Sequence, residues 1–217
     1  MTDAQAREQG VRDAVLAGRL VPVVVLSEPD RAAPLGEALL AGGLRCAEVT
    51  FRTAAAAAAI RAMAAGNPDL IVGAGTVLTV EQVDLAMDAG ARFVVSPGFG
   101  PAVVRRCVEL GIPVFPGATT ATEVQMALDA GLDIVKFFPA EAAGGVRMIE
   151  ALAAPFQAVR FIPTGGIGPD NVARYLAVPS VAAVGGSWMA PPSLVEAADW
   201  AGITRLTRDA VAAVTAA

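Results

Sequence analysis

Short apolar runs alternate with longer alanine-rich stretches along most of the chain. The apolar runs contain many β-branched residues, the alanine-rich stretches have helical character, and glycine or proline marks the joins between them. The apolar runs are residues 21–26, 45–51, 70–76, 92–97, 112–117, 133–138, 159–164 and 181–187, eight in all. Another helical stretch, residues 3–17, precedes the first run. The pattern therefore predicts an N-terminal helix followed by eight β-then-α units.

Threonines stand where three of the helices are expected to begin. Thr53, Thr79 and Thr120 each precede a stretch with helical character. A threonine hydroxyl at this position accepts a hydrogen bond from one of the free amides of the first turn. We therefore expect these three residues to cap their helices.

The eight units predict a parallel barrel. Strands that are apolar nearly throughout are buried on both faces, as in a parallel sheet covered by helices. The 217 residues, divided among eight units, give about 27 residues per unit, compact beside the roughly 250 residues typical of such barrels. We expect an α/β fold of the TIM (β/α)8 type, in one domain over residues 1–217. An open doubly wound sheet is the alternative.

Composition excludes several classes of function. The net charge of -5 provides no basic surface for nucleic acid. No apolar run reaches the roughly 18 residues of a membrane span, and the polar N-terminus lacks the apolar core of a signal peptide, so we expect a cytoplasmic protein without membrane contact. Cys46 and Cys107 are expected to be reduced. Histidine is absent, which excludes imidazole acid–base chemistry and histidine-containing metal sites.

Lys136 is the only lysine in the chain and lies in the apolar segment DIVKFFPAE, residues 133–141. A buried amine is costly when charged, and burial therefore favours the neutral form that can condense with a carbonyl group. The alternative is a lysine held in a salt bridge in the core or at a strand edge. The segment alone does not decide between the two.

Strand periodicity directs a carboxylate toward the same space. Alternation along residues 45–51 sends Glu48 into the barrel, and the same alternation along residues 133–138 sends Lys136 there. A lysine and a carboxylate in a low-dielectric cup can make and break an imine, with the carboxylate moving the protons. The alternative for Glu48 is an ion pair with Arg52 or with an arginine of another unit.

Glycines follow several of the predicted strands at the end where barrel enzymes bind their ligands. The segments GAGT, residues 73–76, and SPG, residues 96–98, allow a ligand or another stretch of backbone to approach closely, and Thr76 offers a hydroxyl. Two Gly-Gly turns end the seventh and eighth strands, where backbone amides often bind phosphate. The walls of this predicted phosphate site are Gly165, Gly166, Gly185, Gly186 and Ser187. Ordinary tight turns are the alternative.

The strings AEVTFRT, GAGTVL, VVSPG, VKFFPAE, FIPTGGI and VGGSWM, in this order over nearly the whole chain, resemble the bacterial 2-keto-3-deoxy-6-phosphogluconate (KDPG/KHG) aldolases. The resemblance implies a class I, Schiff-base aldolase on a TIM barrel. Such a carbon–carbon lyase cleaves KDPG reversibly to pyruvate and glyceraldehyde 3-phosphate in the Entner–Doudoroff pathway. It needs neither a metal nor another cofactor, and it is usually a homotrimer.

The resemblance also implies roles for individual residues. Lys136 falls on the imine former and Glu48 on the acid–base group. The remaining positions are Arg52, Thr76 and Thr164 for the pyruvate carboxylate and hydroxyls, Pro97 and Phe138 for the pocket wall, and the two Gly-Gly turns with Ser187 for the phosphate. Two alternatives stay open: the same chemistry on 4-hydroxy-2-oxoglutarate or 2-keto-3-deoxy-6-phosphogalactonate, or a phosphosugar-binding or isomerising barrel that forms no imine.

Overall fold

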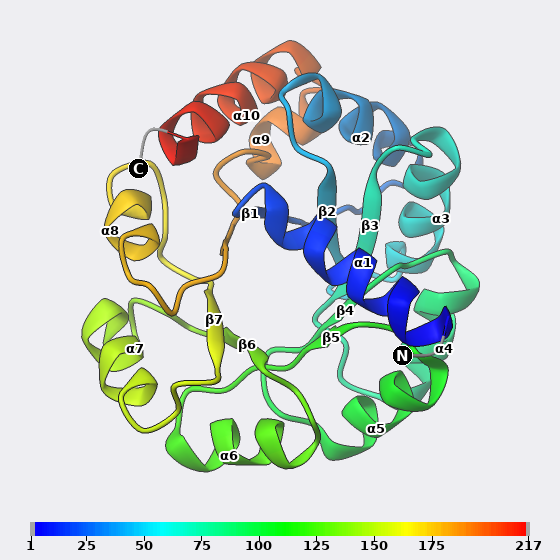
Figure 1. Cartoon of the computed structure of the whole chain (residues 1–217). Helices are drawn as coiled ribbons and strands as arrows, with labels where there is room; N and C mark the ends of the chain where they lie inside the picture. The colour runs from blue at the N-terminus through cyan, green and yellow to red at the C-terminus, as the bar shows by residue number, and fades with distance from the viewer. Residues whose placement is uncertain (1–2, 216–217) are drawn as a thin grey trace.

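Eight parallel strands surround a central axis in the computed structural model, which describes residues 3–215 (Figure 1). The strands are β1 Leu20–Val24, β2 Cys46–Thr50, β3 Ile71–Gly75, β4 Val94–Val95, β5 Val114–Phe115, β6 Ile134–Phe137, β7 Arg160–Pro163 and β8 Val184–Gly186. Each lies within or one residue beyond an apolar run of the sequence. Their residues are nearly all buried, as expected for strands covered on both faces.

The strands close into a barrel, as the sequence predicted. Six strands pair in the order β5-β4-β3-β2-β1-β8, and β6 pairs with β7. Isolated bridges join these two sheets, Gly117 with Lys136 at one junction, and Phe161 with Val181 and Thr164 with Gly185 at the other. Both junctions are closed, which rules out the open doubly wound sheet.

Helices form a ring around the barrel (Figure 1). They are α2 Ala32–Ala41, α3 Ala56–Gly66, α4 Val80–Asp88, α5 Pro101–Leu110, α6 Ala121–Asp129, α7 Gly145–Ala153, α8 Val172–Leu176, α9 Pro192–Glu196 and α10 Trp200–Thr215, with the 3-10 turn η1 Pro29–Arg31 before α2. The N-terminal helix α1, Asp3–Ala17, lies across the barrel instead (Figure 1). Between residues 3 and 215, none of these helices is both long and apolar enough to cross a membrane.

Two of the three predicted threonine caps are confirmed. Thr79 accepts a hydrogen bond from the amide of Gln82, and Thr120 forms a capping box with Glu123. The prediction for Thr53 was wrong. Its hydroxyl donates to the carbonyl of Leu26, just after β1, and α3 begins without a side-chain cap. A tertiary hydrogen bond has replaced the local one.

Helix α1 closes the end of the barrel where the strands begin. Its residues Val11 and Val15 belong to the apolar cluster that fills the barrel, together with Phe93 and Phe115. A salt bridge between Arg12 of α1 and Asp133, just before β6, attaches the helix to the strands. The carboxyl ends of the strands are therefore the end at which a ligand can enter.

Candidate active site

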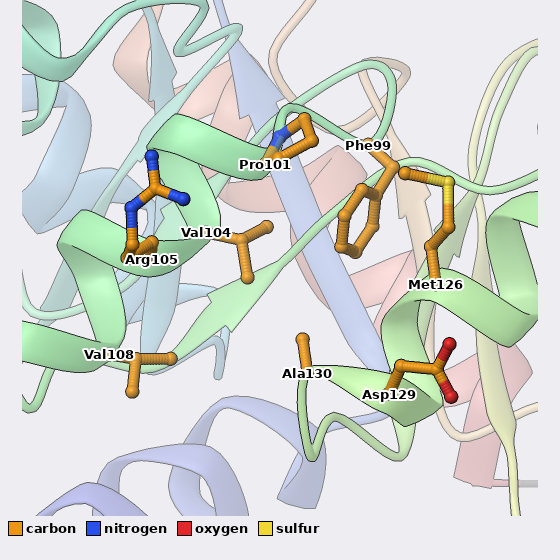
Figure 2. Close-up of a pocket in the computed structure, with 8 residues that line it drawn as sticks. All are labelled: Phe99, Pro101, Val104, Arg105, Val108, Met126, Asp129 and Ala130. Atoms are coloured by element: carbon orange, nitrogen blue, oxygen red, sulfur yellow. The ribbon is translucent and has the colours of Figure 1, made fainter.

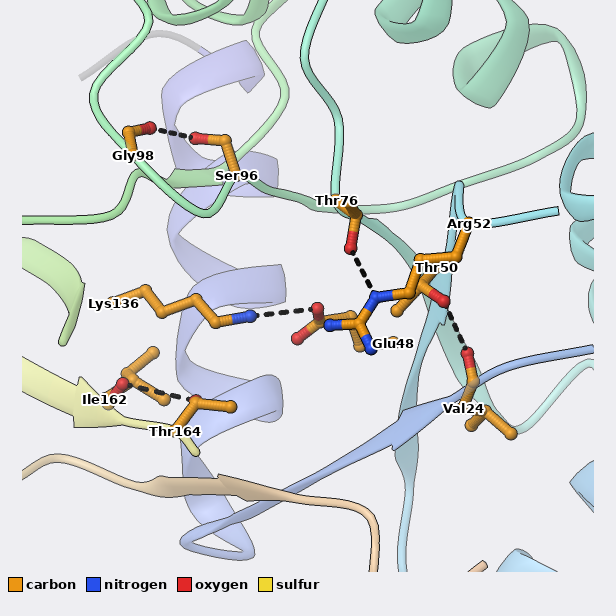
Figure 3. Close-up of polar contacts among 10 residues, drawn as sticks. All are labelled: Val24, Glu48, Thr50, Arg52, Thr76, Ser96, Gly98, Lys136, Ile162 and Thr164. Carbon is orange, nitrogen blue, oxygen red and sulfur yellow. Dashed lines mark hydrogen bonds and ion pairs between the residues drawn. The ribbon is translucent and has the colours of Figure 1, made fainter. Parts of the chain in front are cut away.

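Lys136 and Glu48 meet inside the barrel (Figure 3). Nζ of Lys136, on β6, lies 3.1 Å from Oε1 of Glu48, on β2. The two residues are only 5 % and 2 % exposed. The predicted shared orientation is therefore confirmed. Arg52 is not the partner of Glu48 among the described ion pairs, because its Nε contacts the hydroxyl of Thr76 at 3.4 Å.

The surroundings of Lys136 hold its amine in place. Its backbone amide donates to the carbonyl of Pro116, and its carbonyl accepts from the amide of Ala118, both at 2.8 Å. The ring of Phe138 has its centroid 5.4 Å from Nζ, within the range of a cation–π contact. In this apolar setting a carboxylate at hydrogen-bond distance can take the proton of the ammonium group, which frees the amine to attack a carbonyl carbon.

A pocket of about 380 Å³ opens at the carboxyl ends of the strands. Thr164 lines this rim pocket and also a small internal cavity of about 10 Å³ beside Lys136 and Glu48. The rim pocket includes seven of the residues singled out in the sequence, Arg52, Phe138, Thr164, Gly165, Gly166, Gly186 and Ser187. The structure therefore connects the predicted ligand-binding rim to the buried pair through Thr164.

Sequence reasoning missed the apolar wall of the rim pocket, which includes Val23, Ile167, Ala190 and Pro192. Strand periodicity could have identified Val23, because it alternates with the neighbours that pack against the helices. Ile167 and Ala190 lie in the loops after β7 and β8, and Pro192 begins α9, so strand periodicity covers none of the three. Together they add apolar surface to a pocket that also includes the charged Arg52.

Thr76 and Pro97 do not line the rim pocket. Thr76 contributes its contact with Arg52, and its backbone φ of 56° lies in the left-handed region that a β-branched residue rarely adopts. Pro97 packs its carbonyl against Gly117, so closely that a Cβ atom at Gly117 would overlap it. Both residues lie beside the site rather than in its wall.

The Gly-Gly turn after β7 requires its glycines. Gly165 and Gly166 have φ values of 105° and 76°, a region that other residues adopt only under strain. The second predicted Gly-Gly turn is not a turn, because Gly185 and Gly186 both belong to β8. The space beside Gly185 holds the side chain of Thr164, and the space beside Gly186 holds the ring of Trp188. Similarly, Gly75 of the GAGT segment faces the carboxylate of Glu48. The sequence had predicted Gly185 as a wall of the phosphate site, and Gly75 as a point of close approach for a ligand or backbone.

Other reactive groups are poorly suited to catalysis. Burial raises the pKa of the Cys46 thiol to about 12, and the negative charge of Glu48 adds to the effect. Burial likewise raises the pKa of Cys107 to about 12, so both thiols stay protonated near neutral pH. Within residues 3–215, no group of three or more metal-binding side chains comes together.

A second pocket, of about 410 Å³, lies outside the barrel between α5 and α6 (Figure 2). Its wall is mostly apolar and includes Phe99, Val104, Val108 and Met126. It contains neither Lys136 nor Glu48. The combination of an internal lysine, an internal carboxylate and an open ligand pocket occurs instead at the strand ends.

Comparison with known proteins agrees with this chemistry. A family model described as "KDPG and KHG aldolase" matches residues 11–206. A 2-dehydro-3-deoxy-phosphogluconate aldolase of Treponema pallidum is 53 % identical over 190 residues, which are 88 % of this chain and 90 % of the relative.

Two solved structures are similar over most of their length. The 2-keto-3-deoxy-6-phosphogluconate aldolase of Zymomonas mobilis, crystallised with 3-phosphoglycerate, superposes with a TM-score of 0.89 at 41 % identity, covering 94 % of this chain and 96 % of that one. The KDPG aldolase of Legionella pneumophila, in which pyruvate was captured as a covalent carbinolamine, has a TM-score of 0.87 at 40 % identity, with coverage of 95 % and 97 %.

Proposed function

Because this chain belongs to the family of KDPG and KHG aldolases, we propose that Lys136 forms an imine with its substrate and that Glu48 moves the protons of the reaction. The reaction is the reversible cleavage of KDPG to pyruvate and glyceraldehyde 3-phosphate, which makes the protein a carbon–carbon lyase. The observation that carries the residue assignment is the 3.1 Å contact between these two buried side chains beneath an open pocket.

The first half of the reaction builds the imine. The neutral amine of Lys136 attacks the keto carbon C2 of KDPG to give a carbinolamine, which loses water. Glu48 donates the proton that the departing hydroxyl group needs. The carbinolamine of the Legionella relative with pyruvate is the equivalent adduct from the product side.

The second half breaks the bond between C3 and C4. Glu48 takes the proton of the C4 hydroxyl, the electrons of the C3–C4 bond move into the protonated imine, and glyceraldehyde 3-phosphate leaves. The remaining enamine takes a proton at C3 from Glu48. Water then hydrolyses the protonated imine and releases pyruvate, and Glu48 takes the remaining proton, which leaves the free amine of Lys136.

The rim pocket suits the two ends of such a substrate. We propose that Arg52, supported by Thr76, and the hydroxyl of Thr164 bind the carboxylate and hydroxyl groups, while Phe138 forms part of the wall. The phosphate binds to the backbone amides at Gly165, Gly166 and Gly186 and to Ser187, which line one pocket. Gly185 and Pro97 act through their packing against Thr164 and Gly117.

The family description also includes KHG, that is, 4-hydroxy-2-oxoglutarate, which has the same keto-acid half and no phosphate. We propose that this protein cleaves it as well, because imine chemistry requires only the buried pair. The predicted phosphate contacts then favour KDPG. Comparing kcat/KM for the two substrates measures that preference.

We further propose a homotrimer that works in the Entner–Doudoroff pathway in the cytoplasm, as the family resemblance implies. In support of assembly, large apolar side chains on and near α4 and α5 are exposed, among them Leu78, Leu85 and Val108. Val108 also lines the apolar pocket of Figure 2. Light scattering coupled to size-exclusion chromatography measures the assembly, and a monomer at micromolar concentration would contradict it.

Borohydride trapping tests the assignment of Lys136. Incubation with pyruvate and sodium borohydride should add one reduced pyruvyl group, located at Lys136 by peptide mass mapping. Lys136→Arg keeps the positive charge but cannot form the imine, and should lose both the adduct and the activity. A folded wild-type protein without the adduct would exclude the mechanism.

A further inference from the structure

Glu141 ends the DIVKFFPAE segment, and none of the roles described above uses it. Its Oε1 accepts a hydrogen bond from the hydroxyl of Tyr175 and another, at 3.0 Å, from the guanidinium group of Arg174. Tyr175 is fully buried, and the guanidinium group lies 5.6 Å from the centre of its ring. We call Glu141, Arg174 and Tyr175 the acidic brace. It joins the loop after β6 to helix α8.

The backbone of Glu141 is bonded to the Gly-Gly turn after β7. Its amide donates to the carbonyl of Gly165 at 3.1 Å, and the preceding amide, of Ala140, donates to the carbonyl of Thr164 at 2.8 Å. The side-chain stem of Glu141 also lies against Gly166, where an added Cβ atom would come within 2.8 Å of it. One residue therefore contacts both glycines of the turn.

The opposite side of the turn is fixed from α8. The side-chain amide of Asn171 donates to the carbonyl of Gly166 at 3.0 Å, and its oxygen accepts from the amide of Gly168 at 2.9 Å. Asn171 immediately precedes α8, the helix that carries Arg174 and Tyr175. The acidic brace thus connects Glu141 on one side of the turn to α8, which Asn171 precedes, on the other.

We propose that Glu141 is a positioning residue that sets the preference of this enzyme for phosphorylated substrates. The proposal rests on the phosphate contacts proposed above for Gly165 and Gly166. Backbone amides bind a phosphate tightly only when they are held in the correct positions before it arrives. Tyr175 and Arg174 hold the carboxylate of Glu141 through hydrogen bonds. The backbone of Glu141 is thereby held in place, and it in turn holds the Gly165–Gly166 turn.

The brace acts at the rim, whereas Lys136 and Glu48 meet inside the barrel. Loosening it should therefore weaken the binding of the phosphate end and leave the imine chemistry unchanged. A purely structural role would instead lower the activity on all substrates together. The ratio of the activities on KDPG and on 4-hydroxy-2-oxoglutarate separates these cases, since only KDPG carries a phosphate.

Two variants test the proposal without altering the charge of the site. Tyr175→Phe removes only the hydroxyl, and Glu141→Asp keeps the carboxylate but shortens its reach. For each, we expect KM for KDPG to rise about tenfold, the equivalent of one lost hydrogen bond to a charged group. The kcat for KDPG, and both constants for 4-hydroxy-2-oxoglutarate, should stay within about twofold of wild type by the same arithmetic. Glu109→Asp shortens a carboxylate paired with Arg106 on α5 and is the matched control.

The outcomes are distinct. A wild-type KM for KDPG in both variants, or an equal loss for the two substrates, would overturn the role of Glu141. Failure of the proposed function would appear in the wild type itself, as the absence of a pyruvyl adduct at Lys136. Activity on 4-hydroxy-2-oxoglutarate also reports that each variant is folded, and thermal unfolding provides an independent check.

Discussion

Gly75 and Glu48 share one space, because the carboxylate of Glu48 occupies the position that a side chain at residue 75 would need. A Cβ atom built on Gly75 would overlap Oε1 of Glu48 and lie 2.7 Å from its carboxyl carbon. Such distances are far below ordinary van der Waals contact. Glycine on β3 is thus part of what directs the carboxylate on β2 toward Lys136.

Gly75→Ala should therefore impair catalysis more than folding. We expect the displaced carboxylate to reduce kcat by about 10²-fold, comparable to weakening general acid–base catalysis, with a loss of about 1–3 kcal/mol in the free energy of unfolding. Gly10→Ala is the control, because Gly10 lies in α1 and an added Cβ there meets nothing within 4 Å. Steady-state kinetics and urea denaturation measure the two effects. Unchanged kcat in Gly75→Ala would show that the carboxylate position is not critical.

Glu48→Gln should retain the fold and lose about 10²- to 10⁴-fold in kcat, because the amide cannot accept and return protons. Pre-steady-state mixing with KDPG separates imine formation from bond cleavage. Wild-type turnover in this variant would remove Glu48 from the mechanism.

The buried ion pair should also be visible in stability. Lys136→Met leaves the charge of Glu48 unpaired in the barrel, which should cost about 3–5 kcal/mol in the free energy of unfolding. The double variant Lys136→Met/Glu48→Leu removes both charges and should recover much of that loss. Urea denaturation at pH 7 measures the free energies of unfolding of wild type, Lys136→Met and the double variant. A double variant less stable than Lys136→Met would contradict it.

The two thiols should remain unreactive until the protein unfolds. Burial raises the pKa of Cys46 and Cys107 from 9.0 to about 12. At pH 8 we therefore expect no reaction with a thiol-specific reagent in the native protein and reaction of both thiols in denaturant. Rapid modification of the native protein at either position would contradict the burial.

The same shifts have a consequence for stability in alkali. Because the pKa of each thiol is higher in the folded than in the unfolded protein, the contribution of the thiols to stability is complete below pH 9.0. It is lost as the pH rises toward about 12. Cys107→Ala removes one such group and should show a smaller loss of stability over this interval. Urea denaturation at several pH values between 9 and 11 would measure the difference.

The capping box of α6 should contribute to stability above mildly acidic pH. Burial would raise the pKa of Glu123, but hydrogen bonds from Thr119 and Thr120 outweigh it and lower the pKa below its ordinary value of 4.5. The contribution is therefore present above pH 4.5 and is lost as the pH falls through the lower folded value. Glu123→Ala should cost about 1 kcal/mol at pH 7, with a smaller cost in acid.

The control for this prediction is Glu150→Ala on α7, since Glu150 is exposed and caps no helix. Its free energy of unfolding should stay within about 0.5 kcal/mol of wild type. An equal cost for the two variants would mean that the capping hydrogen bonds contribute nothing.

Sequence periodicity predicted the eight strands and the meeting of Lys136 with Glu48, because strand alternation is a local property. Periodicity gave wrong predictions where a contact between different parts of the chain determines the structure. Gly75 is typical of a close approach by a ligand or backbone and Gly185 of a phosphate site, but the side chains of Glu48 and Thr164 fill the two spaces. Thr53 likewise precedes a helical stretch as a cap would, but its hydroxyl donates a hydrogen bond to a carbonyl of the preceding β-then-α unit. The exposed hydroxyl of Ser187, by contrast, lies in the rim pocket as expected.

The isolated bridges that close the barrel have a consequence for refolding. Lys136 forms the bridge at one junction and Thr164 forms one of the two bridges at the other, so residues of the site also lie at both junctions. A folding chain in which the two sheets have formed separately carries Lys136 on one sheet and Glu48 on the other. The recovery of enzymatic activity then reports when the barrel closes. We expect activity to recover later than secondary structure, which circular dichroism measures.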